Sequence, residues 1–178
     1  VQAPVDLINY GNIDYLTLDY LAEITISIMQ KPKMNNPKFG YALDFVELIV
    51  NNYKKLIKNN IKVISNAGGV NPQECANSIK QKISNKNIKI GIIEGDDIFN
   101  NLDKLISCGA NLSNMDTGEN IDKIRDNICS ANVYIDSYTI KEALDLNANI
   151  VLAGRVSDPG LTLGPLLYEF NWKRNEYN

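Results

Sequence analysis

Two different spacings of hydrophobic residues divide the chain. Up to about residue 59, apolar residues recur at intervals of three and four, which is typical of amphipathic helices. This pattern predicts a helix from Leu16 to Met29 and a longer one from about Tyr41 to Asn59, separated by a break that contains Pro32 and Pro37. Beyond Asn60, apolar runs of strand length alternate with further helical patterns.

These apolar runs and helical patterns together predict the fold class. Strands are expected at Val63–Ile64, Ile88–Ile93, Ala131–Ile135 and Ile150–Ala153. Helices are expected from Asn71-Pro72 to about Ile83, from Asp96 or Asp97 to Ile106 with Gly109 closing it, around Ile121–Ile128, from Ser137 to about Leu146, and from Asp158-Pro159 towards Phe170. Strands that alternate with helices build parallel sheets through right-handed crossovers. We therefore expect a doubly wound α/β fold, a mostly parallel sheet flanked by helices in a Rossmann-like three-layer sandwich.

Length and composition narrow the possible chemistry. The 178 residues suit one α/β domain over residues 1–178. The absence of histidine excludes Ser-His-Asp and Cys-His nucleophile systems and histidine zinc sites within this chain. Acid and base roles therefore fall to Asp, Glu, Lys, Tyr or Cys side chains.

Charge and cysteine usage bear on partners and compartment. The 18 basic and 21 acidic residues are scattered, so neither nucleic acid nor a membrane surface is an expected partner. Apolar stretches are too short to span a bilayer. Cys75, Cys108 and Cys129 are odd in number, lack CxxC spacing and are more typical of buried packing residues. A soluble, cytoplasmic protein is the expectation.

In parallel α/β sheets, ligands bind outside the carboxyl ends of the strands, so the loops there hold the candidate residues. Gly68 and Gly69 lie between a strand and a helix start, where backbone N–H groups receive phosphate or carboxylate. A tight turn that needs glycine is the equally weighted alternative. Asn66 and Asn71 flank this loop as polar ligand-binding candidates, although Asn66 could instead bond the turn and Asn71 cap the helix. The dinucleotide and Walker glycine patterns are both absent from the sequence.

Three carboxylates follow the next strand. Glu94, Asp96 and Asp97 could hold a divalent cation or raise one another's pKa for proton transfer. Asp97 is interpreted mainly as a helix cap, so Glu94 and Asp96 are the catalytic candidates. The cofactor stays unknown, with a divalent cation as one option and no metal ligand assigned.

Arg155 is the most informative single residue. The chain has only three arginines, and this one directly follows a buried apolar run. A bidentate anion receptor favours arginine over lysine, while a structural pair with Asp158 or Asp136 is weighted equally. Asp158 is a third catalytic candidate and also a helix cap.

Charged pairs on the first two expected helices are interpreted differently. Asp19 with Glu23, and Asp44 with Glu47, are expected mainly on solvated helix faces.

Several ordered motifs along the chain resemble one protein family. They are Asp14-Tyr15-Leu16 through Asp19-Tyr20-Leu21-Ala22-Glu23, Gly40-Tyr41-Ala42-Leu43-Asp44-Phe45, Asn66 to Pro72, Glu94 to Asp97, Ser130-Ala131-Asn132-Val133-Tyr134 and Gly154-Arg155-Val156-Ser157-Asp158. This set is similar to the acyclic terpene utilisation (AtuA-type) family. Family members have a further strand and glycine-rich loop before the point matching Val1 and continue beyond Asn178, so the chain is interpreted as a fragment.

The resemblance implies a metabolic role. Members are associated with the breakdown of citronellol- and geraniol-type acids through CoA esters, beside a biotin-dependent acyl-CoA carboxylase. We therefore expect a component that acts on or binds an acyl-CoA or related acid, with a lyase or hydratase-type step favoured over a redox step. The alternative is a non-catalytic CoA-ester or nucleotide-binding subunit that docks on a carboxylase-type partner. A homo-oligomer is a further expectation, and a degenerate member retained for scaffolding is a third interpretation of the function.

Overall fold

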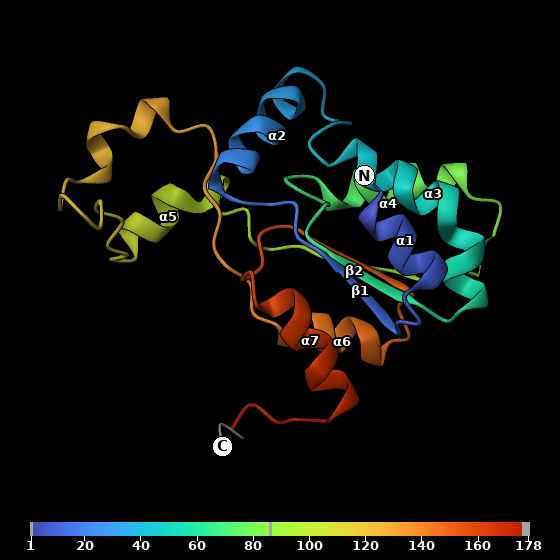
Figure 1. Ribbon diagram of the computed structural model, residues 1–178. Helices are drawn as coiled ribbons and strands as arrows, with labels where there is room; N and C mark the ends of the chain where they lie inside the picture. The colour runs from blue at the N-terminus through green and yellow to red at the C-terminus, as the bar shows by residue number, and fades with distance from the viewer. Residues whose placement is uncertain (1, 86, 176–178) are drawn as a thin grey trace.

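A computed structural model describes residues 2–85 and 87–175, and its centre is a four-stranded, all-parallel sheet (Figure 1). The strands are β1 (Tyr15–Leu18), β2 (Lys62–Ser65), β3 (Ile90–Ile93) and β4 (Ile150–Ala153), in the order β1-β2-β4-β3. Leu16 of β1 lies beside Val63 of β2, and Val63 in turn lies beside Ile150 of β4. The predicted α/β class is confirmed, and β4 has the predicted bounds.

Helices cover both faces of the sheet (Figure 1). One face carries α1 (Ala3–Tyr10), α3 (Leu43–Lys58) and α4 (Pro72–Lys82), and the other carries α6 (Tyr138–Asp145) and α7 (Gly160–Glu169). Strand residues alternate between the two cores because successive side chains point to opposite faces. Val63 and Leu152 pack in the core of α3 and α4, whereas Ile64 and Val151 pack in the core of α6 and α7.

The start of the chain differs from the prediction. Residues 15–18 form β1, and the helix begins later as α2 (Glu23–Asn35). The predicted helix over Leu16–Met29 was wrong at its start because its apolar spacing fits a strand as well. Pairing of Leu16 and Thr17 with β2 decides between the two, since it buries Leu16 in the sheet.

The predicted strand over Ala131–Ile135 is also absent from the four-stranded sheet. This segment makes only isolated bridges, in which Asp97 pairs with Asn132 and Ile135 with Val156. Its apolar residue Val133 is exposed, so no core face selects a strand register.

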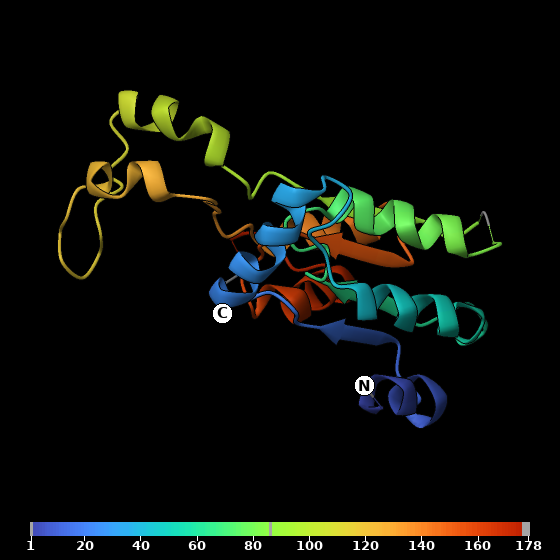
Figure 2. The ribbon, with the colours of Figure 1, turned by 90° about the horizontal axis from the view of Figure 1, so that it is seen from above.

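An arm precedes this segment and projects from the sheet (Figure 2). It contains α5 (Leu102–Ser107) and the short 3₁₀ helices η1 (Phe99–Asn101), η2 (Ile121–Lys123) and η3 (Arg125–Asn127). Arg125 joins its two halves by a 2.6 Å ion pair with Asp103. Within the described part of the chain, no helix is long and apolar enough to cross a membrane.

Candidate functional site

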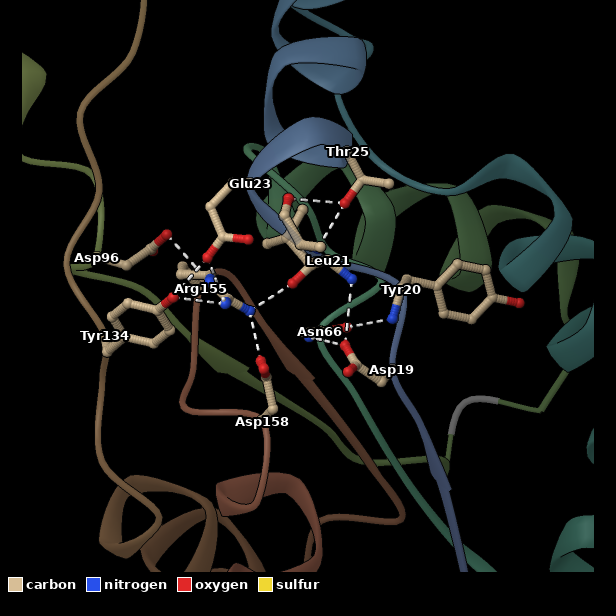
Figure 3. A network of polar contacts seen from close by, with 11 residues as sticks. Asp19, Tyr20, Leu21, Glu23, Thr25, Asn66, Asp96, Tyr134, Arg155 and Asp158 are labelled. Carbon is tan, nitrogen blue, oxygen red and sulfur yellow. Dashed lines mark hydrogen bonds and ion pairs between the residues drawn. The ribbon is translucent and has the colours of Figure 1, made fainter.

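Arg155 is the centre of a polar network at the carboxyl ends of the strands (Figure 3). The residue follows β4 and is only 3% exposed. Nη1 donates to the carbonyl oxygen of Leu21 and, at 2.7 Å, to Asp158 Oδ1. Nη2 donates to Glu23 Oε1 at 3.2 Å and to the Tyr134 hydroxyl at 2.8 Å. The guanidinium also lies 4.3 Å from the centre of the Tyr134 ring.

Three segments far apart in the sequence meet at this guanidinium. Glu23 is the first residue of α2, Tyr134 lies in the segment between the arm and α6, and Asp158 precedes α7. The Tyr134 hydroxyl accepts from Arg155 and donates to Glu23 Oε1 at 2.6 Å. The sequence suggested Asp136 as one possible partner of Arg155, but Asp136 instead forms an ion pair with Arg174 at 2.9 Å.

The network leaves its acidic groups open to solvent. The side chains of Glu23 and Asp158 are 73% and 59% exposed, while that of Arg155 is 4% exposed. The hydrogen bond from Tyr134 is the main reason that the pKa of Glu23 is lowered, with a backbone hydrogen bond and Arg155 adding to it. Two exposed carboxylates are thus held on one buried cation.

Asp96 joins the end of β3 to the end of β4. It is 4% exposed, and its Oδ2 accepts from the backbone N–H of Arg155 at 2.8 Å and from Asn132 Nδ2 at 2.9 Å. Its carboxylate packs so closely on Gly154 that a Cβ there would overlap it. Asp96 therefore fixes the backbone from which the Arg155 side chain extends.

The other two carboxylates after β3 point elsewhere. Glu94 is exposed and lies along the outer edge of β3. Asp97 Oδ1 accepts from the backbone N–H of Phe99 at 3.0 Å, and Oδ2 lies 4.0 Å from Lys33 Nζ. Across residues 2–85 and 87–175, no three His, Cys, Asp or Glu side chains are grouped so as to hold a metal ion.

Asn66 and the loop after β2 are engaged with the chain itself. Asn66 is fully buried, and its side chain accepts from Tyr20 N and donates to Asp19 Oδ1, both at 2.7 Å. Asn66 thereby fixes the connection between β1 and α2 that delivers Glu23 to the site.

The glycine loop is buried rather than open. Gly68 and Gly69 are both buried, and Gly69 has φ +59°. The backbone N–H of Gly69 donates to the carbonyl of Asn66, and that of Val70 to the carbonyl of Gly40, at 3.0 and 2.9 Å. Asn71 Nδ2 donates to two carbonyls of the loop before α3. The loop is thus packed against Met29 of α2 and against the loop that precedes α3.

A groove of about 660 Å³ begins within one helical turn of Glu23. It lies between α2 and the end of the arm. Its lining residues are Ser27, Gln30, Lys31, Met34, Ile124, Asn127, Ile128, Cys129 and Ser130. Because Glu23, Ser27 and Met34 are four and seven residues apart in turn, they lie along one side of α2, and the groove leads away from the acidic network.

Comparison with protein families decides the membership of this chain. The sequence model of the acyclic terpene utilisation family protein AtuA matches residues 1–178. The chain belongs to the AtuA family. Comparisons with curated proteins and with solved structures gave no match. Membership confirms the resemblance, and the family name links the protein to acyclic terpene utilisation.

Two residues of this AtuA-family site were missed from the sequence. Glu23 was expected on a solvated helix face, and it is 73% exposed at the first residue of α2, but its contacts with Arg155 and Tyr134 were not foreseen. Recognition of Tyr15–Leu18 as a strand would have placed the following residues at a strand's carboxyl end. Tyr134 belongs to the family motif Ser130 to Tyr134, but the expected strand there did not show which face its side chain would occupy, because successive side chains of a strand point to opposite faces.

Proposed function

We propose that this AtuA-family protein acts on an acyclic terpenoid acid or its CoA ester by proton transfer, in a hydration or dehydration step. The observation that carries the proposal is the pair of exposed carboxylates, Glu23 and Asp158, held on the buried guanidinium of Arg155. Groups that move protons need solvent or substrate contact together with a fixed position.

The hydrogen bonds of Arg155 favour proton transfer over direct anion binding. Both terminal nitrogens of the guanidinium already donate to protein oxygens, and the side chain is buried. An incoming carboxylate or phosphate would have to displace those partners. Arg155 instead orients Glu23. The hydrogen bond from Tyr134, with Arg155 adding to it, lowers the pKa of Glu23, so this carboxylate is ionised at neutral pH and can accept a proton.

A hydration step balances on the residues present. Glu23 accepts a proton from water as the water oxygen bonds to the β-carbon of an α,β-unsaturated acyl group. The Tyr134 hydroxyl, 2.6 Å from Glu23, gives its proton to the α-carbon and regains one from Glu23. The net result is addition of H and OH across the double bond, and dehydration is the reverse. Asp158 accepts a hydrogen bond from Nη1 of Arg155 and so helps to fix the guanidinium whose Nη2 contacts Glu23 and Tyr134.

The groove along α2 supports the terpenoid part of the substrate. Its volume of about 660 Å³ is within the usual range for small-molecule sites. Met34, Ile124 and Ile128 supply apolar surface for a branched hydrocarbon chain, and Lys31 supplies a positive charge. On α2 the lining of the groove begins at Ser27, four residues after Glu23, so a bound chain would place its carbonyl end towards the network.

A ligand panel tests this proposal. Thermal unfolding is followed with branched acyl-CoA esters, the free acids and straight-chain acyl-CoA esters of equal length. A ligand at 100 times its dissociation constant adds about 2.7 kcal/mol to stability. We expect selective stabilisation by the branched compounds, reduced in Met34→Asp but not in the exposed control Ile57→Asp. Stabilisation without any product would instead indicate a CoA-ester-binding subunit, and no stabilisation by any compound would contradict the proposal.

A further inference from the structure

Within residues 2–85 and 87–175, the outer edge of strand β3 is paired with no other strand. In the sheet β3 pairs with β4 on one side and is the last strand of the order β1-β2-β4-β3. The carbonyls of Lys89 and Ile93 accept from the β4 side, from Ile150 N and Gly154 N respectively. Because backbone groups alternate in direction along a strand, the N–H and C=O groups of Ile90 and Ile92 point outward.

This edge forms the floor of a groove of about 890 Å³ between α4 and α6. Ile90 and Ile92 line it from the strand, Ile88 from the residues just before the strand, and Leu146, which is 76% exposed, at the end of α6. The groove therefore combines a row of outward backbone hydrogen-bonding groups with apolar surface on either side, which is the composition of a strand-pairing interface.

Charge is distributed unevenly along the groove. Exposed Lys89 immediately precedes β3, and exposed Lys80 is in the last turn of α4, which runs back towards the start of β3. Exposed Glu94 immediately follows β3, and Glu142 lines the α6 side. Lys80 and Lys89 thus make the amino end of the edge basic, and Glu94 makes its carboxyl end acidic, while Glu142 lies midway along α6.

We propose that this edge pairs with β3 of a second copy of the chain, antiparallel and across a two-fold axis perpendicular to the sheet. Such an axis places the carboxyl end of one β3 beside the amino end of the other. Glu94 then faces Lys80 of the second copy on the α4 side, and Lys89 faces Glu142 of the second copy on the α6 side. The sheet becomes a continuous eight-stranded one.

The charges select this arrangement over parallel pairing. Parallel pairing would bring the two Lys89 ends together and the two Glu94 ends together, and like charges directly opposite one another destabilise a strand pair. The two-fold contact uses the same patch on both copies, so assembly stops at a dimer. The Arg155 network and the groove along α2 involve other residues, so this proposal is independent of the proposed function.

Charge reversal tests the dimer by sedimentation equilibrium. The wild-type protein is expected to double its mass from 19.9 kDa with rising concentration. Lys80→Glu alone and Glu94→Lys alone should each weaken dimerisation at least tenfold. The double variant should restore it, and so should an equal mixture of the two single variants, because each then meets its opposite charge. Lys58→Glu and Glu47→Lys, exposed on α3, are the matched controls and should leave the dimer unchanged.

Three results would overturn this proposal. They are a wild-type protein that stays monomeric at every concentration, a dimer unaffected by both single reversals, and two weakened single variants that the double variant and the mixture fail to restore. The first result would indicate that the edge receives a strand of another protein instead.

Discussion

The Tyr134 hydroxyl donates a 2.6 Å hydrogen bond to Glu23, a residue 111 positions earlier in the chain. The same hydroxyl accepts from Arg155, so the phenol relays between a buried cation and an exposed carboxylate. This contact ties α2 to the segment that follows the arm. It places a carboxylate and a phenol of the AtuA-family chain in direct contact.

The relay can be tested by Tyr134→Phe, which keeps the ring on the guanidinium and removes the hydroxyl. The pKa of Glu23 should rise towards its ordinary value, because the hydrogen bond from Tyr134 is the largest cause of its lowering. Because the pKa of Glu23 is lower in the folded protein than in the unfolded chain, ionised Glu23 stabilises the fold at high pH, and this stabilisation is lost as the pH falls through the folded-state pKa. The variant lacks most of this stabilisation, so its free energy of unfolding should fall less on acidification. Carboxyl carbon NMR titration measures the shift. An unchanged Glu23 pKa would refute the relay, and Tyr10→Phe, exposed on α1, is the control.

Arg155→Lys keeps the charge but cannot reproduce the forked contacts to four partners. We expect a loss of about 3 kcal/mol in the free energy of unfolding, measured in urea, because buried hydrogen-bonded charges are costly to disconnect. Arg125→Lys is the matched control, because its partner Asp103 is 88% exposed, and it should cost less than about 1 kcal/mol. Equal losses in the two variants would contradict a structural role for the network.

The glycine loop gives a steric prediction. Gly69 has φ +59°, and a Cβ there would overlap the Met29 sulfur and the Gly40 carbonyl. Gly118 has φ +70°, but a Cβ there meets nothing within 4 Å. Gly69→Ala should therefore cost about 3 kcal/mol and Gly118→Ala about 1 kcal/mol. Similar costs in thermal unfolding would mean that the loop is less tightly packed against α2 than described.

The three cysteines should differ in reactivity. Cys75 is buried, which raises its pKa from an ordinary 9.0 to about 12, whereas Cys108 and Cys129 are exposed. A thiol reagent at neutral pH should label two residues quickly and Cys75 only on unfolding. The raised pKa also means that Cys75 favours folding below pH 9.0 and loses this contribution as the pH rises towards 12. Cys75→Ala should flatten that alkaline loss, and rapid labelling of all three would contradict the burial.

The strands and helices that the sequence predicted best are those with one clear apolar period. Strand β4 has four fully apolar residues, is buried on both faces and was predicted with its correct bounds. β1 was not recognised, because Tyr15–Leu18 fits a helical spacing equally well and pairing with β2 decides it. The buried-packing interpretation of Cys108 and Cys129 was wrong, because both are exposed, Cys108 directly after α5 and Cys129 shortly after η3.

The sequence located the candidate site better than its chemistry. Arg155 and Asp158 were singled out by their place after β4. The sequence analysis considered an ion pair between them as an alternative to anion binding, and the structure shows this pair at 2.7 Å. Glu23 and Tyr134 could not be joined to them, since that contact depends on where a long arm returns to the sheet. Whether Glu94, Asp96, Asn66, Gly68, Gly69 and Asn71 touch a ligand stays a prediction.

The most direct test of the proposed chemistry is incorporation of solvent oxygen. An α,β-unsaturated CoA ester of an acyclic terpenoid acid is incubated with the protein in ¹⁸O-enriched water, and the hydroxyacyl product is measured by mass spectrometry. The wild-type protein should form the labelled product, and Glu23→Gln should slow its formation by about a hundredfold or more at unchanged fold and ligand binding. Equal rates of labelling in the two proteins, or none in the wild type despite binding, would contradict a proton-transfer site at Glu23.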